Sequence, residues 1–308
     1  REHATGLVAK IKEKDPIIKV PTQPNKQLLF HFDDSKRELV NLDVNISIEH
    51  NKIYADFKIG QDKMYVLKNL SDFACAKANN YVLEYGKNFT YNPNIHYFYP
   101  DDEYLIDTIE NYGNNLASYF SVSNPKMMHI GKSEFKVFLE TLKNKCFTLN
   151  FNNEQYSPKI IKDVLPISFD VKNNAGKIKL ISNNDLPTPL TDKGDVLLYN
   201  DNIYLLYGEQ ALHYNRIYSV FNQTKDIVFE KEDTQGVLSN LIPKILQFSK
   251  NVKIDDEIKN NIISEFKVEF YFDLKGANII CDLKFVYNDQ DGQKFVLRDL
   301  DKENEFKN

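Results

Sequence analysis

The stretch of residues 57–73, FKIGQDKMYVLKNLSDF, contains three patterns that together indicate the fold class. An alternation of apolar and polar residues ends at Gly60, and a second strand-like run comes after the polar turn at 61–63. A period of two is typical of a half-buried strand. The stretch ends like the start of a helix, because Ser71 can cap a helix and Asp72 complements the helix dipole. These residues therefore predict two antiparallel strands followed by a helix.

The same alternation recurs on both sides of this stretch. Residues 42–48 and 53–59 alternate around a tight turn at His50-Asn51, which predicts an antiparallel hairpin. Further alternating pairs lie at 167–180, 196–207 and 266–287, and the last of these is the strongest strand pattern in the chain. We therefore expect most of the sheet structure to consist of antiparallel hairpins.

Helices are expected between the hairpins. Residues 133–144 give the clearest case, because their apolar side chains fall on one helical face. That face has Phe135, Phe138, Leu139 and Leu142, and the outer side has Lys136, Glu140, Lys143 and Asn144. Other helices are expected at 71–80, from Pro100 onward, at 234–250 with a break at Pro243, and at 255–264. The predicted fold class is α+β: mainly antiparallel sheet with hairpins and about four or five packed helices.

The domain organisation is expected to correspond to these patterns. Residues 1–29 are interrupted by prolines and are interpreted as a connector or edge segment. A lobe with a hairpin and helices is expected at 30–146, a β-rich lobe at 147–298, and a charged tail at 299–308. The chain begins with an arginine and ends in charged residues, and we interpret it as a piece of a longer polypeptide.

The composition limits the classes of function. The 308 residues are 42% hydrophobic and 27% charged, which is typical of a globular chain. The net charge of −5 disfavours strong non-specific binding of duplex DNA, which needs many cations on phosphates. No apolar run approaches the ~18–20 residues of a membrane span, and no signal peptide is recognised, so a cytoplasmic location is expected. Cys75, Cys146 and Cys281 are expected to be reduced and buried.

The chain lacks the usual signatures of catalytic and metal sites. Its glycines are isolated, so neither a phosphate-binding loop nor a dinucleotide fingerprint is present, and its cysteines and histidines are not clustered at zinc spacing. A calcium loop around Asp289–Gly292 would need acids where Tyr287 and Arg298 stand. We therefore predict no catalytic, cofactor-binding or metal-binding residue. An unrecognised stand-alone hydrolase or metal enzyme is the alternative.

Two stretches combine aromatic and basic residues, which is typical of surfaces that contact nucleic acid. They are 85–91 and 132–145, and the candidate residues for a nucleic-acid or partner surface are Lys87, Tyr91, Lys132, Lys136, Lys143 and Lys145. The other interpretation, which we favour, is a core strand with its turn in the first stretch and a helix with a solvated face in the second.

Several of these stretches, in this order, resemble the helicase-associated domain of bacterial Swi/Snf-type ATPases of helicase superfamily two. The resemblance starts with the glycine, lysine and aromatic residues of 59–73 and continues with YGKNFTYNP at 85–93, His96, Phe98 and the acidic helix start at Asp101-Asp102. It includes LPISF at 165–169, LIP at 241–243, and the paired strands FYFDLKG and IICDLKFVY at 270–287. It covers roughly residues 30–290.

The resemblance implies that this chain is one domain of a multidomain ATPase. In such proteins the domain lies between a zinc-finger module and a two-lobed motor that binds ATP and Mg and moves along duplex DNA. This chain contains neither the zinc-finger module nor the motor, so the resemblance implies no catalytic residue in it. ATP and Mg would be bound by the motor of the parent protein. The implied function is a non-catalytic accessory or regulatory module whose partner is its own ATPase motor in cis. Duplex DNA would be reached through the parent, with direct DNA contact as an alternative.

Overall fold

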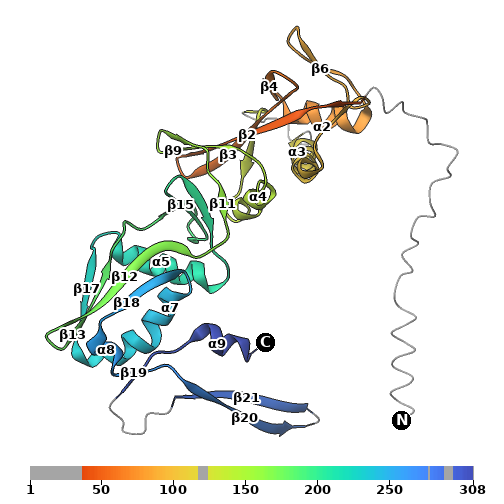
Figure 1. The fold of residues 1–308 in the computed structure, drawn as a ribbon. Coiled ribbons are helices and arrows are strands. Elements are labelled where there is room, and N and C mark those ends of the chain that lie inside the picture. The colour runs from red at the N-terminus through yellow and green to blue at the C-terminus, as the bar shows by residue number, and fades with distance from the viewer. Residues whose placement is uncertain (1–36, 117–123, 277, 288–293, 308) are drawn as a thin grey trace, which may run out of the picture.

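A computed structural model describes residues 37–116, 124–276, 278–287 and 294–307, so the connector expected at 1–29 lies outside the described residues. The first sheet is built on the hairpin of β2 (Asn41–Glu49) and β3 (Lys52–Gly60) (Figure 1). His50 and Asn51 both have positive φ, which is the backbone of the tight hairpin turn that the sequence predicts. The strands that extend this sheet are β4 (Met64–Val66), β8 (Met127–Ile130), β9 (Thr148–Phe151) and β10 (Glu154–Tyr156).

Helices pack on this sheet and close the first hydrophobic core. They are α2 (Leu70–Asn79), the 3-10 turn η3 (Pro100–Asp102), α3 (Glu103–Leu116) and α4 (Phe135–Thr141). Two short strand pairs flank them: β1 (Glu38–Leu39) with β7 (His96–Tyr97), and β5 (Leu83–Tyr85) with β6 (Phe89–Tyr91). The predicted stripe of α4 is confirmed, since Phe135, Phe138, Leu139 and Leu142 are all buried.

The predicted cap of α2 is wrong by two residues. Asn69, and not Ser71, is the N-cap: its Oδ1 accepts hydrogen bonds from the amides of Ser71, at 3.0 Å, and Asp72. Asparagine and serine cap helices about equally well. The sequence pattern alone therefore could not choose between them.

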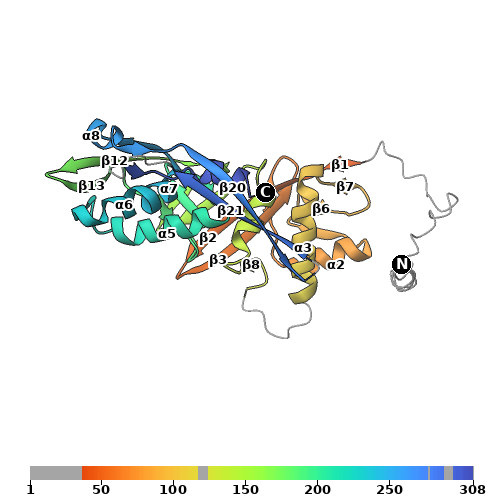
Figure 2. The same cartoon turned by 90° about the horizontal axis from the view of Figure 1, so that it is seen from below.

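The second core lies under a different sheet, with strand order β17-β13-β12-β18. Its strands are β12 (Leu165–Asn174), β13 (Lys177–Ser182), β17 (Asp226–Phe229) and β18 (Ser249–Ile254). The helical elements around it are α5 (Glu209–Phe221), η4 (Lys231–Asp233), α6 (Thr234–Gly236), the π-helical η5 (Val237–Leu241), α7 (Ile242–Leu246) and α8 (Asp256–Lys259). Figures 1 and 2 show α2 and α3 at one end of the molecule and α6 and α8 at the other.

A small sheet joins the two cores. Its strands are β11 (Ile160–Ile161), β14 (Thr188–Pro189), β15 (Val196–Tyr199) and β16 (Asn202–Leu205). Because successive side chains of a strand point to opposite faces, Val196 and Ile203 enter the first core while Leu197 and Tyr204 enter the second. The two faces of this hairpin therefore pack against two different cores.

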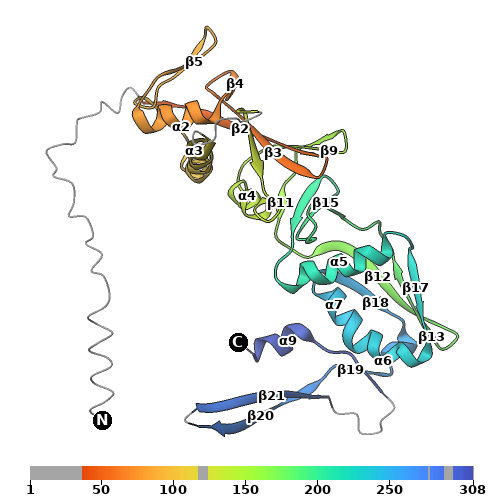
Figure 3. The ribbon, with the colours of Figure 1, turned by 180° about the vertical axis from the view of Figure 1, so that it is seen from behind.

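The C-terminal part contains a long hairpin that pairs with no other described strand. It consists of β20 (Phe266–Lys275) and β21 (Asn278–Tyr287), paired over their whole length (Figures 1 and 3). Beside it, β19 (Ile262–Ile263) pairs with β22 (Phe295–Val296), and α9 (Leu300–Glu305) ends the described chain. The fold class is α+β with mainly antiparallel pairs, as the sequence predicts.

Two observed helices, α5 and α9, have no counterpart among the predicted helices, and two predicted helices are longer than the observed ones. The helix predicted at 234–250 ends at Leu246 and gives way to β18, because strand pairing with β12 takes the residues after it. The helix predicted at 255–264 is only the short α8, followed by β19.

The cysteine expectation is also wrong. Cys75, Cys146 and Cys281 are free but exposed. Each neighbours apolar residues, but Cys75 lies on the outward side of α2, between the buried Ala74 and Ala76. Neighbouring sequence therefore did not determine burial.

Candidate functional site

The six residues predicted to form a binding surface have different environments. Lys87 is exposed in the turn between β5 and β6. Tyr91 is 1% exposed and packs on Phe73, with 5.3 Å between the ring centroids, and on Phe98 and His96. Its role as a stacking platform for bases is therefore wrong, because neither ring face is free. Burial also raises the pKa of Tyr91 well above its ordinary value.

Two of the predicted lysines are neutralised by carboxylates. Lys132 Nζ lies 2.8 Å from Asp192 Oδ2. Lys145 Nζ lies 2.6 Å from Asp102 Oδ1, and Asp102 is buried. The second pair joins η3, which precedes α3, to the segment after α4. The Lys145–Asp102 pair is mostly buried and links two parts of the fold, whereas the Lys132–Asp192 pair is a surface ion pair that contributes little to stability.

Lys136 belongs to a cluster that attaches α4 to the end of β16. Its ammonium lies 3.6 Å from the ring centroid of Tyr207 and donates a hydrogen bond to the carbonyl of Leu206. Burial lowers the pKa of Lys136. The prediction that this side chain points to the outer, solvated side of the helix is wrong, because the end of β16 covers that side.

The same cluster contains a shared carboxylate. Glu140 Oε1 accepts hydrogen bonds from the Tyr207 hydroxyl at 2.6 Å and from Lys162 Nζ at 3.0 Å. These two bonds, the tyrosine's first, lower the pKa of Glu140. The ionised form therefore prevails at neutral pH and fixes the position of both partners.

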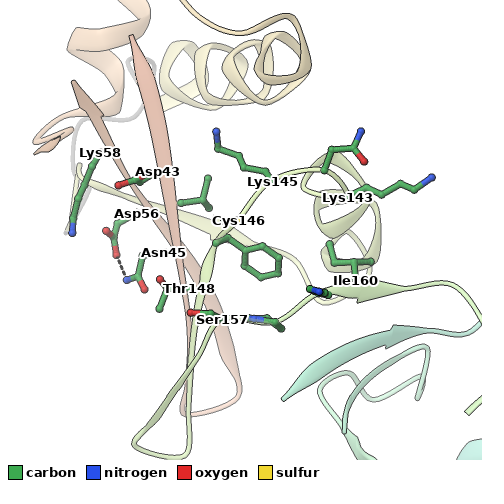
Figure 4. A pocket seen from close by; sticks show the side chains of 15 residues that line it. Asp43, Asn45, Asp56, Lys58, Lys143, Lys145, Cys146, Thr148, Ser157 and Ile160 are labelled. Carbon is green, nitrogen blue, oxygen red and sulfur yellow. Dashed lines mark hydrogen bonds between the residues drawn. The ribbon is translucent and has the colours of Figure 1, made fainter. Parts of the chain in front are cut away.

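Lys143 lies at the rim of an open hollow of about 590 Å³ between the first sheet and the end of α4 (Figure 4). Lys58 and Lys159 also line this hollow, and all three lysines are exposed. None of the three has an ion-pair partner among the residues that the structure describes. Asp43 and Asp56 lie on the sheet side, and Asn45 Nδ2 donates to Asp56 Oδ2 at 2.7 Å. Lys145 lines the hollow as well, but Asp102 pairs with its charge, so Lys58, Lys143 and Lys159 face two carboxylates, those of Asp43 and Asp56.

Sequence reasoning missed Lys58 and Lys159. Lys58 lies directly opposite Asp43 in the β2–β3 register. Its position on the polar face of β3 results from the alternation, so this residue could have been found. Lys159 comes from the loop after β10, and only the packing of β11 on β16 brings it to the same hollow.

The hairpin β20–β21 has two different halves. At its base, Phe266 packs on Phe285 with 5.2 Å between ring centroids, and Phe306 after α9 packs on both rings. Glu303 of α9 is fully buried there: its Oε1 accepts hydrogen bonds from the Tyr287 hydroxyl at 2.7 Å and Arg298 Nε at 2.9 Å. Toward the tip, Phe270, Phe272, Leu274 and Ile279 are 53–72% exposed.

Ionisation at the hairpin base depends on these contacts. Burial by itself would raise the pKa of Glu303, but hydrogen bonds from Arg298 and Tyr287 outweigh it and lower the pKa. The same contacts act on the tyrosine: burial, and then the bond to Glu303, raise the pKa of Tyr287 to about 12. The base is therefore a buried carboxylate held ionised between a cation and a hydroxyl.

The described residues contain no group of three or more His, Cys, Asp or Glu side chains that could hold a metal ion. In the part of the chain that the structure describes, no helix is long and apolar enough to cross a membrane. Two surfaces stand out among the described residues: the hollow lined by Lys58, Lys143 and Lys159, and the apolar tip of the β20–β21 hairpin.

Comparison with known proteins identifies the family. The profile of the family described as bacterial SNF2 helicase associated matches residues 126–308, from β8 to the end of the chain. This is more than half of the chain, and it includes α4, the second core, the hairpin and α9. The motifs at 59–102 precede the matched segment. No curated protein and no solved structure matches. The chain therefore belongs to the bacterial SNF2 helicase-associated family.

Proposed function

We propose that this chain is a non-catalytic accessory module that regulates an SNF2-type ATPase motor, acting on it in cis. The observation that carries the proposal is the family match over residues 126–308. ATP and Mg would be bound by the motor, and duplex DNA would be reached through it. A cytoplasmic location is part of the same proposal.

The environments of the ionisable groups support a binding role. Catalytic groups need pKa values tuned toward the working pH. Glu140 and Glu303 have pKa values lowered by hydrogen bonds, and burial lowers the pKa of Lys136, but each of these groups serves packing between elements. Lys58, Lys143 and Lys159, which line the hollow, lie instead on an open surface.

The decisive experiment compares the motor with and without this module. The DNA-stimulated ATPase and translocation rates of the parent ATPase are measured with residues 1–308 present, deleted, and added back in trans. We expect deletion to change the stimulated rate and add-back to restore it partly. Unchanged rates in all three would overturn the proposal. The chain alone, assayed for ATP hydrolysis and in a broad hydrolase screen with metal analysis, tests the alternative that it is an enzyme.

A second candidate function, direct DNA contact, is favoured by the three exposed lysines of the hollow. Backbone phosphates would be bound by Lys58, Lys143 and Lys159. Fluorescence anisotropy of labelled duplex and single-stranded DNA is measured across a salt series for the wild type and for Lys143→Glu with Lys159→Glu. Each lost phosphate contact should reduce the salt slope by about 0.9 for duplex DNA.

Lys225→Glu is the control and is compared with the single variant Lys143→Glu, so that both reverse one charge. The Lys225 side chain is 80% exposed, lies outside the hollow and is 3.4 Å from Asp185. An unchanged affinity and slope in the double variant would exclude the hollow as the DNA surface. A loss in Lys225→Glu equal to that in Lys143→Glu would show only a general charge effect and would exclude it as well.

A further inference from the structure

The distal half of the β20–β21 hairpin presents one continuous apolar face. In its register Phe270 lies opposite Leu283, Phe272 opposite Cys281, and Leu274 opposite Ile279. Directly opposite residues of an antiparallel pair place their side chains on the same face. Phe272, Leu274 and Ile279 are each more than 70% exposed. The face is therefore ordered by strand pairing, and no described residue covers its outer part.

Such a face is not explained by the stability of the hairpin alone. A two-stranded hairpin without a third strand or a packed helix is only marginally stable in water. The base satisfies this requirement through Phe306 and Glu303, but among the described residues the tip has no such support. Exposed apolar patches of this kind mark interaction sites. A partner that covers the tip would supply the missing support.

The charges of the hairpin indicate what kind of partner fits. On the opposite face three cations balance three anions: Lys267, Lys275 and Lys284 against Glu269, Asp273 and Asp282. Binding to nucleic acid requires an excess of cations toward the phosphates. A neutral hairpin with an aliphatic and aromatic face instead fits an apolar protein surface.

The size of the face indicates how the partner is held. An exposed aromatic side chain offers about 150–250 Å², so the four distal side chains together present on the order of 500 Å². A stable interface between separate proteins needs roughly 800 Å² on each side. Two copies joined through this face alone would fall short of that area. A partner surface that is tethered to the module does not need 800 Å² on each side, because the tether raises its effective concentration and so compensates for a small area.

We propose that the distal apolar face of β20–β21 docks on an apolar surface of the SNF2-type ATPase motor. This inference rests on the proposed function, which supplies the tethered partner. The hairpin lies inside the segment that matches the family, so the docking contact belongs to the part of the chain that defines the family. The hairpin then acts as an arm that fixes the module against the motor.

Cys281 provides a probe that is already in place. It is exposed and lies on the apolar face, opposite Phe272. Cys75 is exposed on α2 and is the internal control, whereas Cys146 lines the same hollow as Lys143. The rate of maleimide labelling of each cysteine is measured by mass spectrometry in the chain alone, with duplex DNA, and with the motor. We expect the motor to slow labelling of Cys281 about tenfold, which corresponds to about 1.4 kcal/mol of docking, with Cys75 unchanged.

The outcomes separate this inference from the function on which it rests. If the module still alters the ATPase but Cys281 is labelled at the free rate, the docking face is refuted and the function stands. If neither the ATPase nor any labelling rate changes, both fail. If DNA protects Cys281 without the motor, the partner is nucleic acid and the inference is overturned. If a higher concentration of the chain alone protects Cys281, the partner is a second copy and the inference is overturned as well.

A pair of neighbouring substitutions provides the matched test. Phe272→Ser removes an apolar anchor, and Tyr271→Ser removes a 52% exposed ring from the opposite face of the same strand. We expect Phe272→Ser to abolish the protection of Cys281 and the effect on the ATPase, and Tyr271→Ser to leave both unchanged. Equal effects of the two variants would contradict docking through the apolar face.

Discussion

Two hairpins of this protein have the same sequence pattern and opposite environments. In β12–β13 the alternating apolar residues Ile167, Phe169 and Leu180 are completely buried. In β20–β21 the equivalent residues toward the tip are more than half exposed. The difference lies in the helices that pack on each hairpin: α5 and α7 cover the face of β12, whereas only the short α9 reaches the base of β20 (Figure 3). Alternation determines which residues share a face, and other elements determine whether that face is covered.

The largest expected effect tests the covered hairpin. Phe169 packs on Phe221 of α5, with 5.8 Å between ring centroids, and on Phe248. Phe169→Ala should lower the free energy of unfolding by about 3–5 kcal/mol, because it leaves a cavity in a packed core. Urea unfolding followed by circular dichroism measures this change. A loss below about 1 kcal/mol would mean that the second core repacks freely, and the contrast between the hairpins would be lost.

A smaller effect is expected where the exposed hairpin is anchored. Glu303→Ala leaves Arg298 and the Tyr287 hydroxyl without their shared acceptor. An unsatisfied buried group costs about 1–3 kcal/mol, so hydrogen exchange of the amides at the hairpin base and in α9 should accelerate about 5- to 150-fold. Exchange in β12 and β13 serves as the internal control. Equal acceleration there would show that the hairpin does not open on its own.

The pH dependence of stability tests the same anchor. Because the pKa of Glu303 is lower in the folded state than its ordinary value of 4.5, its ionised form stabilises the fold fully above that value. This stabilisation is lost as the pH falls through the lowered folded pKa, since the unfolded state then binds more protons. The stability difference between wild type and Glu303→Gln should be constant near neutral pH and shrink below about pH 4.5. Near-ultraviolet circular dichroism in urea measures it; a difference that stays constant into strong acid would contradict the assignment.

The smallest effect is expected at the tip. Phe272→Ala in the chain alone should change the free energy of unfolding by less than about 0.5 kcal/mol, since surface substitutions away from packed features rarely exceed that value. It removes the same atoms as Phe169→Ala, so the two variants form a matched pair for urea unfolding. A loss comparable to that of Phe169→Ala would show that the tip is covered within the chain itself.

The candidate surfaces were predicted from sequence only in part. The run 132–145 did contain Lys143, which lines the hollow, but Lys132, Lys136 and Lys145 are engaged by Asp192, Tyr207 and Asp102. Their partners lie 43 to 71 positions away in the sequence, and nothing in the local pattern identifies them. The prediction for Tyr91 is wrong for a different reason: the alternation of β6, a local pattern, buries Phe89 and Tyr91 together, as the favoured interpretation of a core strand implies.

The sequence by itself determined several local elements and the family. The period-two runs predicted the β2–β3, β12–β13 and β20–β21 hairpins, the apolar stripe predicted α4, and the break at Pro243 is where the π-helical η5 gives way to α7. These features depend on backbone periods and on residues close in the chain. Helix α5 was missed because its buried face, from Ala211 to Phe221, is mixed with polar residues such as His213, which is itself buried.

Only the tertiary structure decided which faces are covered and which charges are engaged. The exposure of the three cysteines, the engagement of Lys136 by Tyr207 and the uncovered tip of β20–β21 all depend on elements distant in sequence. Burial and ion pairing depend on which elements lie close in space. The sequence period determines only which side chains share a face of one helix or strand. The division at residue 146 stays a prediction, since β9 pairs with β2 while the β15–β16 hairpin enters both cores.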